Sequence, residues 1–153
     1  MDLDFKIESI PQRWVVYRRA TCARQRLGET ITSPAVLPGI YDFARRHEAN
    51  PGPPYARYLS CSDSDCDLQV GVEIAKAIPP QGDIVVDCYA ACRVVTVEFI
   101  GPYDQLGKAY DACPAYVKRK NLRLGGPCWE LYHPPTSPDP STSRTCIFWP
   151  IEV

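Results

Sequence analysis

The feature that most constrains the fold of this chain is a repeat, because the second half of the sequence follows the pattern of the first. Each half starts with a short run of β-branched residues and continues into a helix-forming segment that opens at a proline and ends in basic residues. A glycine-proline turn and two further strand-like runs follow. The matching segments are 14–16 with 93–95, 33–49 with 102–119, 52–58 with 126–132, and 70–72 with 147–149. Such self-similarity predicts two copies of one supersecondary unit.

Each copy reads as strand-helix-strand-strand, over half-repeats at about 13–75 and 93–151. We therefore predict an α+β fold made of duplicated βαββ halves with pseudo-two-fold symmetry, in which a curved antiparallel sheet carries two helices on one face. The helices are expected near 33–49 and 102–119. If the sheet curves, its other face would form a cleft. At 153 residues, the whole of 1–153 is expected to be a single ligand-binding domain.

Local signals support both predicted helices. Ser33 followed by Pro34 is typical of a helix start, and a loop through Gly28 is expected before it. In the second helix, Leu106, Ala109 and the residues after them keep the three-to-four spacing of one buried face. Pro114 lies inside that helix and is expected to kink it.

Composition and charge narrow the function classes. The chain is 45% hydrophobic and 23% charged, with a net charge of −1, so no global field attracts it to nucleic acid or to anionic lipid. No apolar run reaches the length of a membrane span, and the first residues are acidic, unlike a secretory signal. We expect a cytoplasmic protein, a monomer or a dimer, that binds neither DNA nor membranes.

Eight cysteines are many for a chain of this length. The spacings Cys61-x4-Cys66 and Cys88-x3-Cys92 leave zinc binding and disulfides open as alternatives, although structural zinc sites favour closer pairs. Because a cytoplasmic protein keeps its thiols reduced, we expect free thiols. Since neither spacing is that of a tight structural zinc site, we expect no metal, and we also expect no cofactor.

The stretch around Glu130 is the strongest candidate for a functional site. Residues 125–127 (Gly-Gly-Pro) open it, Pro134 and Pro135 close it, and the five residues between read as one strand. Alternation places Glu130 and Tyr132 on one side of the strand and Trp129 on the other. Glu130 is then either a solvated surface carboxylate or a carboxylate in an aromatic cavity, which must find a partner or bind a cation.

At these residues the chain resembles the GyrI-like small-molecule-binding domain, which also serves as the effector-binding domain of AraC- and MerR-type multidrug regulators. The resemblance spans nearly the whole chain and is carried by 52–58, 65–72, 101–106 with 109–110, 129–132 and 147–151. It implies a stand-alone duplicated α+β domain with a central pocket for hydrophobic, often cationic, aromatic compounds. It also implies that Glu130 is the acid of that pocket. We expect no helix-turn-helix reader here, because strand signals begin within the first dozen residues.

Aromatic residues around Glu130 would attract a lipophilic cation through their ring faces. The expected ligand-binding residues are Glu130, Tyr58, Tyr103, Tyr110, Tyr132 and Trp149. Phe148 would replace Trp149 if the last strand turns the other way, and His133 is expected at the rim.

Two other functions remain open. Since some members of the resembling family hydrolyse strained, reactive natural products, the chain is alternatively a detoxifying hydrolase with Glu130 as general acid or base. No G-x-S-x-G nucleophile motif occurs in the sequence. The second alternative is inhibition of another protein, as in the gyrase inhibition known for a family member.

Overall fold

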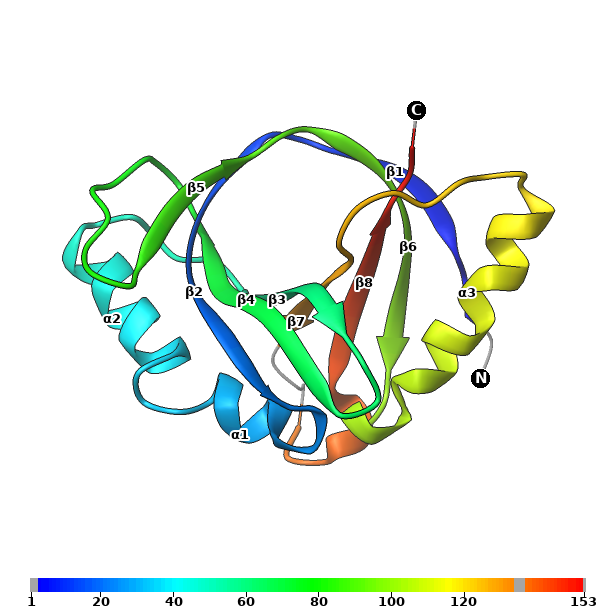
Figure 1. The fold of residues 1–153 in the computed structure, drawn as a ribbon, viewed down its shortest axis with the longest axis horizontal. Coiled ribbons are helices and arrows are strands. Elements are labelled where there is room, and N and C mark those ends of the chain that lie inside the picture. Colours follow the sequence, from blue (N-terminus) through cyan, green and yellow to red (C-terminus); the bar gives the residue numbers. More distant parts are fainter. Residues whose placement is uncertain (1–2, 134–136, 153) are drawn as a thin grey trace. The chain divides into compact units, whose positions relative to one another are not determined.

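The structure is a computed structural model of the chain and describes residues 3–133 and 137–152. Within these ranges the chain forms eight strands, each paired antiparallel with its neighbours, and three α-helices (Figure 1). The α+β prediction is confirmed. The strands are β1 (Lys6–Ile10), β2 (Arg13–Ala23), β3 (Pro54–Cys61), β4 (Asp65–Ile74), β5 (Val85–Tyr89), β6 (Cys92–Ile100), β7 (Trp129–His133) and β8 (Arg144–Pro150). The helices are α1 (Leu27–Ile31), α2 (Leu37–Arg46) and α3 (Gly107–Arg119).

The chain divides into two compact units that share one topology. The first unit is Pro11–Ala91. The second unit combines two segments of the chain, one that ends at Ile10 and one that begins at Cys92. Strands run in the order β5-β2-β4-β3 in the first unit and β1-β6-β8-β7 in the second. Position by position, β2 corresponds to β6, β4 to β8 and β3 to β7, which agrees with the repeat seen in the sequence.

The repeat is longer than the sequence analysis predicted, since each copy begins with one more strand. β1 immediately precedes β2 along the chain but pairs with β6, while β5 immediately precedes β6 but pairs with β2. Each copy is therefore ββαββ, and its first strand belongs to the sheet of the other copy's second strand. The segments 6–10 and 85–89 lie outside the predicted half-repeats, because their pairing with the other copy depends on contacts between segments distant in the chain.

In the first unit, α2 covers the face of the sheet formed by β2 and β4. Ile40 and Phe43 of α2 are buried against Val16, Val72 and Ile74. The predicted helix at 33–49 is shorter than expected, because the residues from Ser33 to Val36 form a turn before it. The short helix α1 was wrongly predicted as loop; five residues carry too little periodicity to reveal a helix.

The second unit buries the equivalent face of its sheet under α3. Cys113 and Ala109 of α3 pack with Phe99, Ile147 and Trp149 of the strands below. The predicted helix at 102–119 is interrupted at its start, where Tyr103–Gln105 form a 3-10 turn. Pro114 lies inside α3, as predicted.

One expectation about the cysteines is wrong. Cys61 and Cys66 face each other across the β3–β4 hairpin and are joined by a disulfide, whereas free thiols were expected. The hairpin places the two residues in register, which the x4 spacing alone did not establish. The other six cysteines are free thiols.

Two further expectations concern the end of the Glu130 strand and the presence of membrane spans. Pro134 and Pro135, predicted to end the Glu130 strand, lie outside the described residues. Within the described residues, no helix has both the length and the apolar character needed to cross a bilayer.

Candidate functional site

Glu130 lies in β7 and is almost completely buried, with 5% of its surface exposed. Its partner across the sheet is Ile147, a member of the core under α3. Because directly opposed residues point to the same face, Glu130 faces α3. The pocket was expected on the face opposite the helices, and that placement is wrong for Glu130.

Both carboxylate oxygens of Glu130 accept hydrogen bonds from tyrosines. The Tyr110 hydroxyl, from α3, donates to Oε2 at 2.5 Å, and the Tyr132 hydroxyl, from β7 itself, donates to Oε1 at 2.6 Å. Tyr110 reaches the strand because it is on the α3 face next to the buried Ala109 and Cys113. These donors replace part of the hydration that a carboxylate loses on burial. The carboxylate is thus held in one orientation.

Aromatic rings extend the site in two directions. Trp149 of β8 meets the Tyr110 ring edge-on, with centroids 5.5 Å apart. Tyr103 meets the Tyr132 ring in the same way at 5.9 Å, and Tyr103 is the exposed member of the set at 53%. Of the six predicted ligand-binding residues, five are therefore gathered in one unit: Glu130, Tyr103, Tyr110, Tyr132 and Trp149.

The remaining candidates lie elsewhere. Tyr58 is half-buried in β3 of the first unit, and its role stays a prediction. Phe148 points to the face opposite α3, where it stacks on Trp129 with centroids 4.9 Å apart, so Trp149 and not Phe148 accompanies Glu130. His133 is half-buried at the end of β7, on the Trp129 side of the strand.

Sequence reasoning missed two residues beside this cluster. Thr145 is directly opposite Tyr132, is fully buried, and its hydroxyl has no hydrogen-bond partner among the described residues. Cys128 lies near Tyr110 and Glu130, and both residues influence the pKa of its thiol. The alternation of β8, in which Thr145, Ile147 and Trp149 share a face, was the signal that could have pointed to Thr145.

The thiols near the site are held in their neutral form. Burial raises the pKa of Cys128, and the nearby Glu130 carboxylate raises it further. Burial, with a smaller effect of Cys128, raises the pKa of Cys113 to about 11. A thiol with a raised pKa is a poor nucleophile at neutral pH, because the thiolate is the reactive form.

We therefore expect slow alkylation of Cys113 in the folded protein. At pH 8 its thiolate fraction should be about 100-fold below that of a thiol with the ordinary value of 9.0, since each pKa unit is a factor of ten. Iodoacetamide labelling followed by mass spectrometry, in buffer and in urea, measures the ratio. The folded-state rate should rise about tenfold per pH unit between pH 8 and 10. Equal rates in buffer and urea at pH 8 would contradict the assignment.

Among the described residues, no three His, Cys, Asp or Glu side chains lie close enough together to hold a metal ion. The groups brought together around Glu130 are one buried carboxylate, two phenols, the surrounding rings, and the Thr145 hydroxyl and Cys128 thiol beside them.

The family described as GyrI-like small molecule binding domain matches residues 3–152. The chain belongs to this family. No curated protein compared with the chain matches it.

Solved structures share the fold. The C-terminal domain of EcmrR is 22% identical with a TM-score of 0.80, and the match covers 99% of each chain. In a complex of EcmrR with DNA the identity is 19% and the TM-score 0.79; the match covers 98% of this chain but only 57% of the EcmrR chain.

Two further solved structures with lower identity are a complex with a small-molecule ligand and a hydrolase. SAV2435 bound to tetraphenylphosphonium is 13% identical, with a TM-score of 0.61 and coverage of 97% of this chain and 94% of the other. A hydrolase from Listeria innocua is 9% identical, with a TM-score of 0.64 and coverage of 97% and 91%. At such identities the likeness establishes the fold alone.

Proposed function

We propose that the chain binds hydrophobic, cationic aromatic molecules, with Glu130 as the countercharge. The observation that carries the proposal is a carboxylate 5% exposed whose two oxygens accept bonds from neutral phenols. Burial makes the negative charge costly and weakens screening by water, so a ligand cation would be attracted strongly.

The rings around Glu130 support the same ligand class. Tyr110, Tyr132 and Trp149 surround the carboxylate with aromatic surface, and each ring face that meets a cation contributes about 0.5–2 kcal/mol. Few directional groups are needed, so ligands of similar size and charge but different structure could share the site. Tyr103, the exposed ring at the edge of the cluster, is the proposed point of first contact.

The relatives agree with this proposal at the level of ligand class. Tetraphenylphosphonium, the ligand of SAV2435, is a permanent cation enclosed by four aromatic rings. The match to EcmrR covers the C-terminal domain, so for this chain we propose ligand binding and no direct recognition of DNA.

Titration with tetraphenylphosphonium tests the proposal. Saturable quenching of tryptophan fluorescence is expected, because Trp149 contacts the Tyr110 ring beside Glu130. Calorimetry in parallel gives the stoichiometry, expected to be one cation per chain. Neutral triphenylphosphine oxide should bind more weakly, because it offers no charge to the carboxylate. Absence of saturable binding by both methods would refute the proposal.

A hydrolase using the same residue is the second candidate, favoured by the Listeria relative that is described as a hydrolase. Glu130 would act as a general base toward water, with Tyr110 and Tyr132 holding its carboxylate in place. Product formation from strained electrophiles such as epoxides distinguishes this function from binding. Turnover that disappears in Glu130→Gln would establish it, and stable binding without product favours the first proposal.

A further inference from the structure

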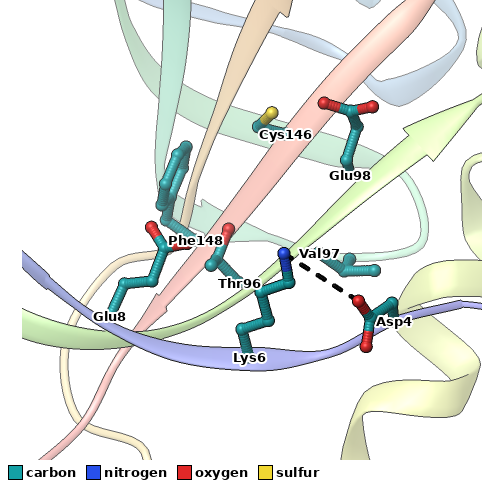
Figure 2. Close-up of a pocket in the computed structure, with 8 residues that line it drawn as sticks. All are labelled: Asp4, Lys6, Glu8, Thr96, Val97, Glu98, Cys146 and Phe148. Carbon is teal, nitrogen blue, oxygen red and sulfur yellow. Dashed lines mark ion pairs between the residues drawn. The ribbon is translucent and has the colours of Figure 1, made fainter.

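The second unit contains a hollow on the face of its sheet opposite α3, with a volume of about 360 Å³ (Figure 2). It lies over β1, β6 and β8 and does not include Glu130. We call it the Thr96 hollow. Its lining residues are Asp4, Lys6, Glu8, Thr96, Val97, Glu98, Cys146 and Phe148. Its volume is within the range of small-molecule sites.

The strand register explains why these side chains converge. Lys6, Thr96 and Phe148 are directly opposite one another across β1, β6 and β8, so they form one row on one face. Glu98 and Cys146 form the neighbouring row. Phe148 also stacks on Trp129, the residue directly opposite it on β7. The hollow thus has an aromatic side at Phe148 and a polar side at Glu98 and Cys146.

Thr96 is the polar residue at the centre of the hollow. It is buried, with 7% of its surface exposed, and lines the hollow in Figure 2. Within the described part of the chain its hydroxyl has no hydrogen-bond partner. The oxygen is not one of the fully enclosed polar atoms without a partner, so it opens onto the hollow, where a ligand can reach it. Its oxygen can accept one N–H bond from a ligand.

The charges around the hollow favour a cation. Three carboxylates and one ammonium line it. Lys6 pairs with Asp4 at 3.9 Å, and Glu98 is bonded to Arg144 at 2.8 Å. Glu8 has no ion-pair partner among the described residues and remains as the uncompensated charge. Burial raises the pKa of the Cys146 thiol; the Glu98 carboxylate raises it further, Arg144 lowers it, and Glu8 raises it.

The geometry points to the Thr96 hollow as a second ligand site, which takes a protonated primary amine with a small aromatic or alkyl body. Glu8 supplies the countercharge, Thr96 accepts one ammonium N–H, and Phe148 packs against the body. An –NH₃⁺ group has three donors, and Thr96 and Glu8 supply acceptors for two of them. A quaternary cation cannot donate to these acceptors, so this site selects a different class of cation from the Glu130 site. The inference does not depend on the function proposed for Glu130.

Binding of phenethylamine to the full chain, measured by calorimetry and by amide shifts at Thr96 and Cys146, tests this site. Glu8→Gln should weaken binding by about two- to fivefold, the scale of an exposed ion pair. Lys6→Met should strengthen it by a similar factor, because it removes a competing ammonium. Both residues are exposed, so neither change should disturb folding. Thr96→Val, which keeps the shape, should weaken binding by about tenfold, and Thr96→Ser should restore it.

Ligand controls separate the alternatives. The trimethylammonium analogue of phenethylamine and neutral 2-phenylethanol should both bind the hollow more weakly than the primary amine. Glu130→Gln should leave phenethylamine binding unchanged. If that variant abolishes binding while Glu8→Gln and Thr96→Val do not alter it, the amine occupies the Glu130 site and the inference is wrong, although the proposed function stands. Reversed effects of the Lys6 and Glu8 variants, or no binding at about 10 mM amine, would also overturn it.

Discussion

Glu130→Gln is expected to weaken tetraphenylphosphonium binding by about 1–3 kcal/mol, or roughly 5- to 150-fold in Kd. Glutamine keeps the shape of the side chain and removes the charge, so the loss reports the electrostatic contribution. One tyrosine can still donate to the amide oxygen, while the other faces an NH₂ group and must rotate its hydroxyl to accept. Calorimetry on both proteins, at one fixed salt concentration, measures the difference.

The chain supplies a matched control for this substitution. Glu98 is a carboxylate in the same unit, but it is 42% exposed, bonded to Arg144, and on the opposite face of the sheet. Glu98→Gln should leave tetraphenylphosphonium affinity within about twofold. Neutral triphenylphosphine oxide should bind Glu130→Gln no worse than the unchanged protein. Suppose that the two variants lower tetraphenylphosphonium affinity equally. The loss would then reflect long-range attraction to the net surface charge, and Glu130 would not be the countercharge of a binding site.

Gly71→Ala is expected to destabilise the fold by about 3 kcal/mol or more, at the upper end for overpacking. A Cβ added at Gly71 would lie 2.0 Å from the Val16 carbonyl oxygen and 2.7 Å from the Tyr17 Cβ. The obstacle is the backbone of β2, which pairs with β4 at this position, so neither strand can yield without breaking the ladder. Thermal unfolding followed by circular dichroism should show Tm lowered by about 6–12 °C.

Gly107→Ala is the matched control for this effect. It makes the same chemical change at the first residue of α3, where nothing lies within 4 Å of the added Cβ. Alanine favours helix over glycine, so stability should be unchanged or raised by up to about 1 kcal/mol. A Gly71→Ala protein as stable as the Gly107→Ala protein would mean that β2 and β4 do not approach as closely as described.

The sequence by itself determined the central strands and the two long helices, and it made Glu130 the candidate acid. Alternation over β7 and the spacing of buried residues in α3 are local patterns, set by the periods of strand and helix, so they could be read directly. The repeat added the prediction of two equivalent copies related by pseudo-two-fold symmetry. Resemblance to a family then favoured a pocket carboxylate over a surface one at Glu130, and the structure shows that this side chain is buried.

Only the tertiary structure decided which face carries the site and which groups complete it. The pairing of Glu130 with Ile147 turns the carboxylate toward α3, and this depends on the register between β7 and β8. The exchange of β1 and β5 between the repeats likewise depends on long-range pairing. Alternation says that two sets of side chains point apart, but it cannot say which set meets a helix, because that is fixed by contacts between segments distant in the chain.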